Sequence, residues 1–398
     1  MRKVVVSEGV YWVGAIDWNI RNFHGFTYST QMGTTYNAYL IMDEKIALVD
    51  TVLKDFAGEM LGKIKAIIDP HKIDYLIANH VETDHSGSIP EVMKIVPQAK
   101  VFCTAKGKEG LSKHYFEDWD FQTVKTGEEL NLGAKTLKFI EAPMLHWPDS
   151  MFTLIEKDKL LLPNDAFGQH LASSERFDDQ VDEKVLMDQA GEYYANILWP
   201  FSSLILKKIE ELSKLGVEIK TIAPSHGIIW RKHPDKIIQS YLKWAKGEAD
   251  KRILIVYDTM WGSTEKMAKK ILEGIQNEGI EGKIYRLPLS NQTKIIKDLL
   301  EAKGILIGSS TINRDIIPTV APFLEELKGL RPVKKIGGAF GSYGWAGGAM
   351  KTIEESLKKA GIEMAFPPLE VKYHPNEEEL DKCFEFGKDF AKRIQMSG

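Results

Sequence analysis

Cysteine is scarce in this chain, which contains only Cys103 and Cys383 and no Cys-x-x-Cys pair. A rubredoxin-type or zinc-ribbon module is therefore excluded, as is an iron–sulfur cluster held only by cysteine.

The sequence also lacks a basic excess and a long hydrophobic run. Its 52 Lys+Arg nearly balance 56 Asp+Glu, for a net charge of -4, whereas nucleic-acid-binding proteins usually carry a strong positive excess. No run reaches the roughly 18 apolar residues of a membrane span, and the first residues lack the apolar region of a signal peptide. We therefore expect a cytoplasmic protein that binds neither nucleic acid nor membrane.

The length of 398 residues predicts two domains, or at most three. A polar stretch with a glycine at 247–251 suits a linker, so the predicted domains are 1–249 and 250–398. The first half begins with a β-hairpin over 36–50 and a helix over 56–68. It continues with strands near 73–79, 101–104, 136–141, 151–156, 159–163 and 221–224. This mixture predicts a layered α/β domain.

Regular alternation of strands and helices marks the second half. We predict five strands near 252–257, 283–287, 304–308, 335–340 and 369–373, with helices between them and after the last. This pattern predicts a doubly wound parallel sheet.

A dense group of metal-ligating side chains follows the predicted strand over 73–79. His80, Glu82, Asp84 and His85 fall within six positions. In an extended backbone His80, Glu82 and Asp84 would project to one side, because side chains alternate there. A solvated polar loop is the alternative, but four such groups so close together favour a metal site.

Three further candidates, His146, Asp165 and His226, lie near the ends of later predicted strands. Each alone is more typical of a hydrogen-bonded structural residue. All seven together are enough ligands for two metal ions, with one carboxylate bridging. A shell rich in carboxylates favours non-haem iron over zinc, although manganese would accept the same ligands.

The pattern His80-x-Glu82-x-Asp84-His85, followed by His146, Asp165 and His226, resembles that of the flavodiiron proteins. The related metallo-β-lactamase hydrolases have histidine at the position of Glu82. The resemblance covers nearly the whole chain and implies an N-terminal metallo-β-lactamase-like αββα sandwich with a di-iron centre. One iron would bind His80, Glu82 and His146, the other Asp84, His85 and His226, and Asp165 would bridge them.

The same resemblance implies weaker assignments near the substrate pocket. His24 and one of Tyr193 and Tyr194 are similar to family residues there, and we assign His24 and Tyr194 as catalytic proton or hydrogen-bond donors. His170 receives no role.

A loop after the strand near 252–257 offers a phosphate site. Its hydroxyls and backbone N–H groups at a helix start can bind a phosphate without a cationic side chain. The loop comprises Thr259, Met260, Trp261, Gly262, Ser263 and Thr264. It resembles the flavodoxin loop and has Ser263 in place of the commoner asparagine.

Two later loops follow the third and fourth strands of the second half, where the edge of such a sheet binds its ligand. They contain Ser309, Ser310, Thr311, Ile312 and Asn313, and then Ser342, Tyr343, Gly344, Trp345 and Gly347. The flavodoxin resemblance implies FMN as the cofactor, with Trp345 stacked on the flavin.

These sites together indicate a reductase of a small diatomic gas. Reduced FMN and two ferrous ions hold the four electrons that convert O₂ to water, and two electrons convert two NO to N₂O. The family implies an external electron donor such as rubredoxin and a head-to-tail homodimer. The alternatives are a dinuclear metallo-hydrolase with a regulatory flavodoxin domain, and an electron carrier without catalysis. The sequence does not rank O₂ against NO.

Overall fold

The computed structural model describes residues 3–25, 27–214, 216 and 218–397. By internal packing the chain forms two compact units: Met1–Tyr193 with Ser203–Tyr241, and Tyr194–Ser202 with Leu242–Gly398. The boundary between the units after Tyr241 lies inside helix α7 (Pro234–Ala245), whereas we predicted a boundary after residue 249. The last turn of α7 belongs with the second unit because Trp244 packs against Tyr194.

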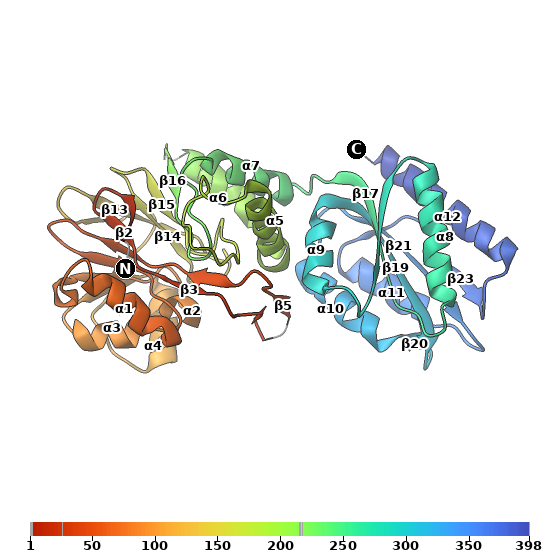
Figure 1. Cartoon of the computed structure of the whole chain (residues 1–398), viewed down its shortest axis with the longest axis horizontal. Coiled ribbons are helices and arrows are strands. Elements are labelled where there is room, and N and C mark those ends of the chain that lie inside the picture. The colour runs from red at the N-terminus through yellow and green to blue at the C-terminus, as the bar shows by residue number, and fades with distance from the viewer. Residues whose placement is uncertain (1–2, 26, 215, 217, 398) are drawn as a thin grey trace. The chain divides into compact units, whose positions relative to one another are not determined.

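The first unit is built on two β-sheets (Figure 1). The larger has the order β1 (Val4–Ser7), β2 (Val10–Trp12), β7 (Tyr39–Ile41), β8 (Ala47–Val49), β9 (Tyr75–Ile77), β10 (Lys100–Cys103) and β11 (Phe121–Thr123). The smaller has the order β12 (Glu129–Asn131), β13 (Thr136–Glu141), β14 (Met151–Ile155), β15 (Leu160–Leu162) and β16 (Thr221–Ile222). The predicted hairpin is confirmed, since β7 pairs antiparallel with β8.

Strands at the centre of the larger sheet are buried on both faces. Tyr39 and Ile41 of β7 point into the core between the two sheets, whereas Leu40 points to the core under helices. Those helices are α1 (Ala57–Lys65), α3 (Ile89–Ile95) and α4 (Ala105–Tyr115). Helices α5 (Glu183–Tyr193), α6 (Ser202–Lys214) and α7 lie beside the smaller sheet (Figure 1). The layers run helix, sheet, sheet, helix, which confirms the predicted β-lactamase-like fold.

Two short strand pairs in the first unit were not predicted. They are β3 (Ala15–Asp17) with β6 (Thr34–Tyr36), and β4 (Asn22–Phe23) with β5 (Tyr28–Ser29). Their strands of two or three residues are too short to give a period-two pattern that a sequence reading can detect. They hold Phe23, His24, Thr34 and Thr35 close to the side chains described below.

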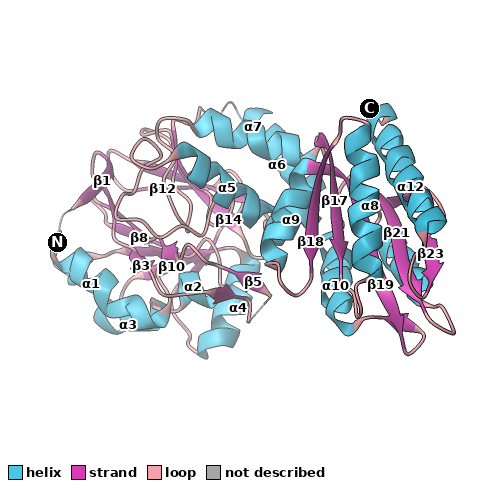
Figure 2. Cartoon of the chain, turned by 45° about the vertical axis from the view of Figure 1, so that its right-hand side comes forward, coloured by secondary structure: helices cyan, strands magenta, loops and turns pink. Residues whose placement is uncertain are grey.

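The second unit contains the predicted parallel sheet, seen clearly in Figure 2. Its five main strands run in the spatial order β18 (Glu281–Arg286), β17 (Asp250–Tyr257), β19 (Ala302–Ile312), β21 (Ile336–Tyr343) and β23 (Leu369–Lys372). Two short strands that we did not predict complete the sheet: β22 (Glu363–Met364) pairs parallel with β21, and β20 (Asp315–Ile316) pairs antiparallel with β19. Numbered along the chain, the order of the five main strands is 2-1-3-4-5, the flavodoxin-like arrangement whose ligand crevice lies beside the first and third strands. The helices are α8 (Ser263–Asn277), α9 (Gln292–Glu301), α10 (Ala321–Leu330), α11 (Ala349–Lys359) and α12 (Glu377–Met396).

No helix in the described part of the chain combines the length and the apolar composition needed to cross a membrane.

Helices α8 and α12 lie side by side in both views and approach each other closely through glycine (Figures 1 and 2). A Cβ added to Gly274 would lie 2.0 Å from the carbonyl oxygen of Phe384, and one added to Gly387 would lie 2.1 Å from that of Ile271. Both obstacles are backbone atoms, so the helices themselves would have to separate.

We therefore expect Gly387→Ala to lower the free energy of unfolding of the second unit by about 1–3 kcal/mol, the usual cost of overpacking. The matched control is Gly329→Ala in α10, where an added Cβ meets nothing within 4 Å. That control should be neutral or stabilise by up to about 1 kcal/mol, because alanine favours the helix. Calorimetry of the two variants tests this, and equal stability would contradict it.

Candidate functional site

The seven predicted ligands come together at one end of the β-sandwich of the first unit. Each follows a strand: β9 precedes the group 80–85, β13 precedes His146, β15 precedes Asp165, and β16 precedes His226. All are buried except Glu82, whose side chain is 19% exposed. Residues far apart in the sequence thus converge because their strands end at the same edge.

The backbone of this ligand loop differs from the extended form that we predicted. Thr83–Ser86 form a short helix, α2, so Asp84 does not share a direction with His80 and Glu82. Successive helical side chains are about 100° apart, which turns Asp84 and His85 away from Glu82. The side chains accordingly form two groups, His80 with Glu82 and His146, and Asp84 with His85 and His226.

The carboxylate of Asp165 lies between the two groups and faces each with a different oxygen. Its Oδ2 is 3.7 Å from His80 Nε2 and 3.3 Å from His146 Nε2. Its Oδ1 is 3.1 Å from His85 Nε2 and 3.5 Å from His226 Nε2. Asp165 is therefore placed to bridge two cations.

The other two carboxylates each lie within one group. Glu82 Oε2 lies 3.4 Å from the Nε2 atoms of both His80 and His146. Asp84 Oδ2 lies 3.1 Å from His226 Nε2.

Several of these close atoms make no hydrogen bond. His80 Nε2, His85 Nε2, Asp84 Oδ1 and Asp165 Oδ2 are all buried and have no hydrogen-bond partner in the described part of the chain. Buried polar atoms are nearly always satisfied, so each such atom requires an explanation. Metal coordination supplies one, because imidazole nitrogens and carboxylate oxygens pointing at common centres fit the donor set of two iron ions.

Opposite charges face one another within the cluster. Burial opposes protonation of His80, but Asp149 and Glu82 outweigh it and raise its pKa to about 10. Burial likewise opposes protonation of His146, and Asp165 and Glu82 raise its pKa to about 10. Burial alone would raise the pKa of Asp165, yet His85 and His146 hold it well below its usual range. The carboxylates are therefore ionised and favour cations at this position.

Three side chains or backbone groups outside the seven hold the ligands in place. Asp149 Oδ2 accepts from His80 Nδ1 at 2.9 Å, and the carbonyl oxygen of Thr35 accepts from His226 Nδ1 at 2.7 Å. Tyr193 donates its hydroxyl to Asp165 Oδ1 at 3.0 Å. Asp149 and Thr35 had no signal in the sequence, because their contacts join segments that are remote along the chain.

Tyr193, and not the Tyr194 that we assigned, is the tyrosine that donates to Asp165. The hydroxyl of Tyr194 lies 3.0 Å from Ser202 Oγ, and the Tyr194 ring packs on Trp244. Tyr193 is the last residue of α5, and the next residue begins a π-helical turn, η3 (Tyr194–Leu198). Neighbouring helical side chains point in different directions, so only one of the two tyrosines can face Asp165.

The two remaining histidines near the cluster differ in environment. His24 Nε2 lies 3.4 Å from Glu82 Oε1 with its side chain 38% exposed, and Glu82 raises its pKa. His170 is buried, with Nδ1 2.7 Å from Thr34 Oγ1 and its ring stacked on Phe23. Burial holds the pKa of His170 well below its usual range. His24 is thus close enough to act at the site, whereas His170 supports the wall behind His226.

The second unit has a crevice of about 680 Å³ at the carboxyl ends of its strands. Eleven of the predicted cofactor residues line it: Met260, Trp261, Ser263, Ser310, Thr311, Ile312, Asn313, Ser342, Tyr343, Gly344 and Trp345. Trp261 and Trp345 are 87% and 89% exposed, which is unusual for tryptophan and leaves their faces available for stacking on a flat ring.

Five other predicted residues do not line the crevice. Thr264 is fully buried, and its hydroxyl lies 2.9 Å from Ser310 Oγ and 3.1 Å from Ser342 Oγ. Thr259 Oγ1 accepts from Gly262 N, and Ser309 Oγ accepts from Ile317 N. Gly347 lies beside Glu370, whose Oε1 would be 3.2 Å from a Cβ added to the glycine. Thr259, Thr264 and Ser309 therefore shape the loops from behind.

The crevice also contains residues that the sequence reading missed: Arg314, Ala346, Tyr373 and His374. His374 Nδ1 lies 3.1 Å from Ser263 Oγ, at the start of α8. Tyr373 and His374 follow β23, and the fifth strand of a parallel sheet ends at the same edge as the others. Their position at the end of the fifth predicted strand would have indicated that they lie at the crevice.

Comparisons with known proteins agree with both halves of this description. Residues 34–227 match the ODP family beta lactamase, and residues 255–387 match the flavodoxin family. A nitric oxide reductase of Moorella thermoacetica is 54% identical over 99% of each chain, and a coenzyme F420H₂ oxidase of Methanothermobacter marburgensis is 45% identical over 98% of each. The structure of the rubredoxin oxygen:oxidoreductase of Desulfovibrio gigas superposes with a TM-score of 0.97 at 41% identity, covering 99% of each chain.

The two adjacent tyrosines give a direct test of the metal cluster. Tyr193→Phe removes the hydroxyl donor to Asp165, and we expect metal affinity to fall about 10- to 100-fold, as when other groups that orient ligands are removed. Tyr194→Phe is the matched control and should leave metal affinity unchanged. Metal titration of the metal-depleted protein measures both, and equal effects of the two variants would refute the assignment.

The exposed tryptophans test the crevice. Trp345→Ala should weaken FMN binding about 5- to 150-fold, since stacking on one aromatic side chain contributes about 1–3 kcal/mol. Leu289→Ala removes a comparably exposed apolar residue that lies outside the lining and should not alter FMN affinity. Fluorescence titration with FMN distinguishes the two, and unchanged affinity in Trp345→Ala would rule out stacking on this residue.

Proposed function

The chain belongs to the flavodiiron protein family, and on this basis we propose that it reduces O₂ to water, NO to N₂O, or both. It is an oxidoreductase with the ligand groups of a di-iron site and a flavodoxin domain for FMN. The names of its relatives divide between the two gases.

The observation that carries this proposal is the division of Asp165 between the two ligand groups. One oxygen faces His80 and His146, and the other faces His85 and His226. A pair of metal ions so close together can bind both atoms of a diatomic molecule, or one molecule on each ion.

The identity of the residue at position 82 favours redox chemistry over hydrolysis. A histidine there would complete the pattern of the zinc hydrolases, whereas Glu82 adds a negative charge that stabilises the more highly charged ferric state. A flavin crevice in the same chain adds a source of electrons, for which a hydrolase has no use.

When bound, two irons and FMN would together supply up to four electrons to the gas. The chain's own residues hold and shield the site. Asp165 and Glu82 would bind the irons together with the histidines, while Tyr193 orients Asp165 through its hydroxyl. His24, half-exposed beside Glu82, is placed to deliver a proton from Nε2 to the gas-derived oxygen.

Electrons must enter through FMN from a separate donor. Both cysteines are buried and unpaired, so these 398 residues contain no all-cysteine iron site of their own. Rubredoxin is the proposed donor; reduced coenzyme F420 is the alternative, because a relative is named as its oxidase.

We further propose a head-to-tail homodimer in which the flavin of one chain serves the irons of the other. The cytoplasmic location stays a prediction.

Gas consumption by the reduced, iron- and FMN-loaded protein tests the function. The unmodified protein should consume O₂ or NO, and Glu82→His should lose this activity by about 100-fold or more, since even residues behind the ligands contribute 10- to 100-fold. Glu91→His, on the nearby helix α3, is the control and should retain activity. Two zinc ions per chain with hydrolytic turnover, and no consumption of either gas, would instead establish the hydrolase alternative.

A further inference from the structure

We propose that Asp149 is a positioning residue that fixes His80 and makes the His80–Glu82–His146 group the tighter of the two metal positions. This inference rests on the proposed di-iron site and adds to it a difference between its two halves.

Asp149 holds His80 through a single buried oxygen atom. Its Oδ2 accepts from His80 Nδ1 at 2.9 Å and from the backbone N–H of Val81 at 2.8 Å. Asp149 is only 4% exposed, and Thr104 Oγ1 donates to its carbonyl oxygen at 2.9 Å. The hydrogen bond from Thr104 holds the backbone of Asp149 in place, and the carboxylate accepts from two successive residues of the ligand loop.

An ionised carboxylate can only accept hydrogen bonds, so Nδ1 of His80 must carry a proton. The other nitrogen, Nε2, then faces the cluster, where it lies 3.4 Å from Glu82 Oε2 and has no hydrogen bond of its own in the described chain. The Trp147 and His80 rings pack nearly at right angles, with 5.1 Å between their centroids and an angle of 84° between their planes. Asp149 and Trp147 together define the orientation of the His80 ring.

The histidines of the second group have weaker support than His80. His226 Nδ1 donates to a neutral backbone carbonyl, that of Thr35. His85 Nδ1 is buried and has no hydrogen-bond partner among the described residues. A carboxylate behind a metal-ligating histidine raises the basicity of the ring and reduces its freedom. We therefore expect the metal bound by His80, Glu82 and His146 to be held more tightly than its neighbour.

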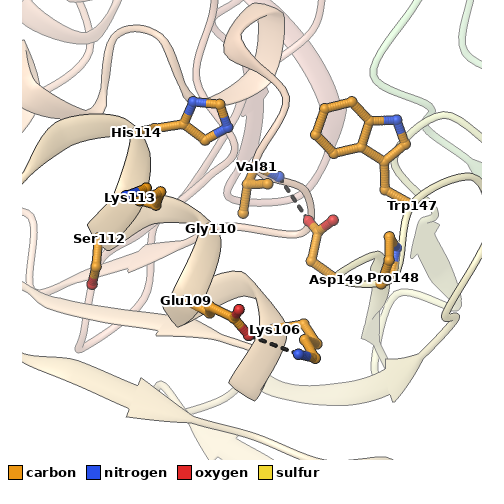
Figure 3. A pocket seen from close by; sticks show the side chains of 10 residues that line it. All are labelled: Val81, Lys106, Glu109, Gly110, Ser112, Lys113, His114, Trp147, Pro148 and Asp149. Atoms are coloured by element: carbon orange, nitrogen blue, oxygen red, sulfur yellow. Dashed lines mark hydrogen bonds and ion pairs between the residues drawn. The ribbon is translucent and has the colours of Figure 1, made fainter.

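The matched control is Glu109, which lines the same surface pocket of about 740 Å³ as Asp149 (Figure 3). Asp149, Val81 and Trp147 line one side of the pocket, and helix α4 lines the other. The Lys106 Nζ atom donates to Glu109 Oε2 on α4 at 2.7 Å, and the dashed line in Figure 3 marks this pair. Glu109 is thus a second carboxylate in the same pocket that does not contact His80.

The experiment compares Asp149→Asn, Asp149→Ala and Glu109→Gln with the unmodified full-length protein. Zn²⁺ is titrated into each metal-depleted protein in competition with a chromophoric chelator, and the melting temperature of each metal-depleted protein is recorded. Asparagine keeps the shape and an acceptor for Val81 N–H, so Asp149→Asn should fold even if Asp149→Ala does not.

We expect the unmodified protein to bind two Zn²⁺ with unequal affinities. In Asp149→Asn the higher affinity should fall about 10- to 100-fold with the lower one unchanged, and Glu109→Gln should leave both unchanged. Unchanged affinities in Asp149→Asn would overturn the inference and leave the proposed function intact. An equal fall of both affinities together with a lower melting temperature would also overturn it, because Asp149 would then support only the fold. Failure of the unmodified protein to bind two ions would refute the di-metal site itself.

Discussion

The first unit depends on one buried carboxylate that is shared by two groups of ligands. Transferring ionised side chains out of water costs several kcal/mol per ion unless each has close partners of opposite charge. Asp165 meets this condition by facing His80 and His146 with one oxygen and His85 and His226 with the other. Four strand ends must therefore reach the same place, and the β-sandwich is the scaffold that brings them there.

A shell of weaker contacts gives this arrangement its precision. Asp149 and Thr35 each bind the outer nitrogen of one histidine, and Tyr193 binds the shared carboxylate. None of the three is part of the ligand pattern itself. The unequal character of these partners, one charged and one neutral, means that chemically similar ligands need not hold two metals equally.

The crevice of the second unit is built mainly from neutral groups instead of buried charges. It has few charged groups and relies on the start of α8, on hydroxyls that bond to one another, and on two exposed tryptophans. Hydroxyls and backbone N–H groups hold a phosphate without strong charge. The same chain thus combines a highly charged, buried group of metal-ligating side chains with an open crevice that has few charged groups.

The sequence by itself determined the two-domain α/β architecture, the parallel sheet of the second half and the seven candidate ligands. These follow from local patterns, namely residue spacing and strand–helix alternation. Tertiary structure decided the rest. It showed that residues 83–86 are helical, which separates Asp84 from Glu82, and that Tyr193, not Tyr194, reaches Asp165. It also brought in Asp149 and His374. Their partners lie 69 and 111 residues away, and the direction of a side chain across such a distance is set by how elements pack, which spacing along the chain does not encode.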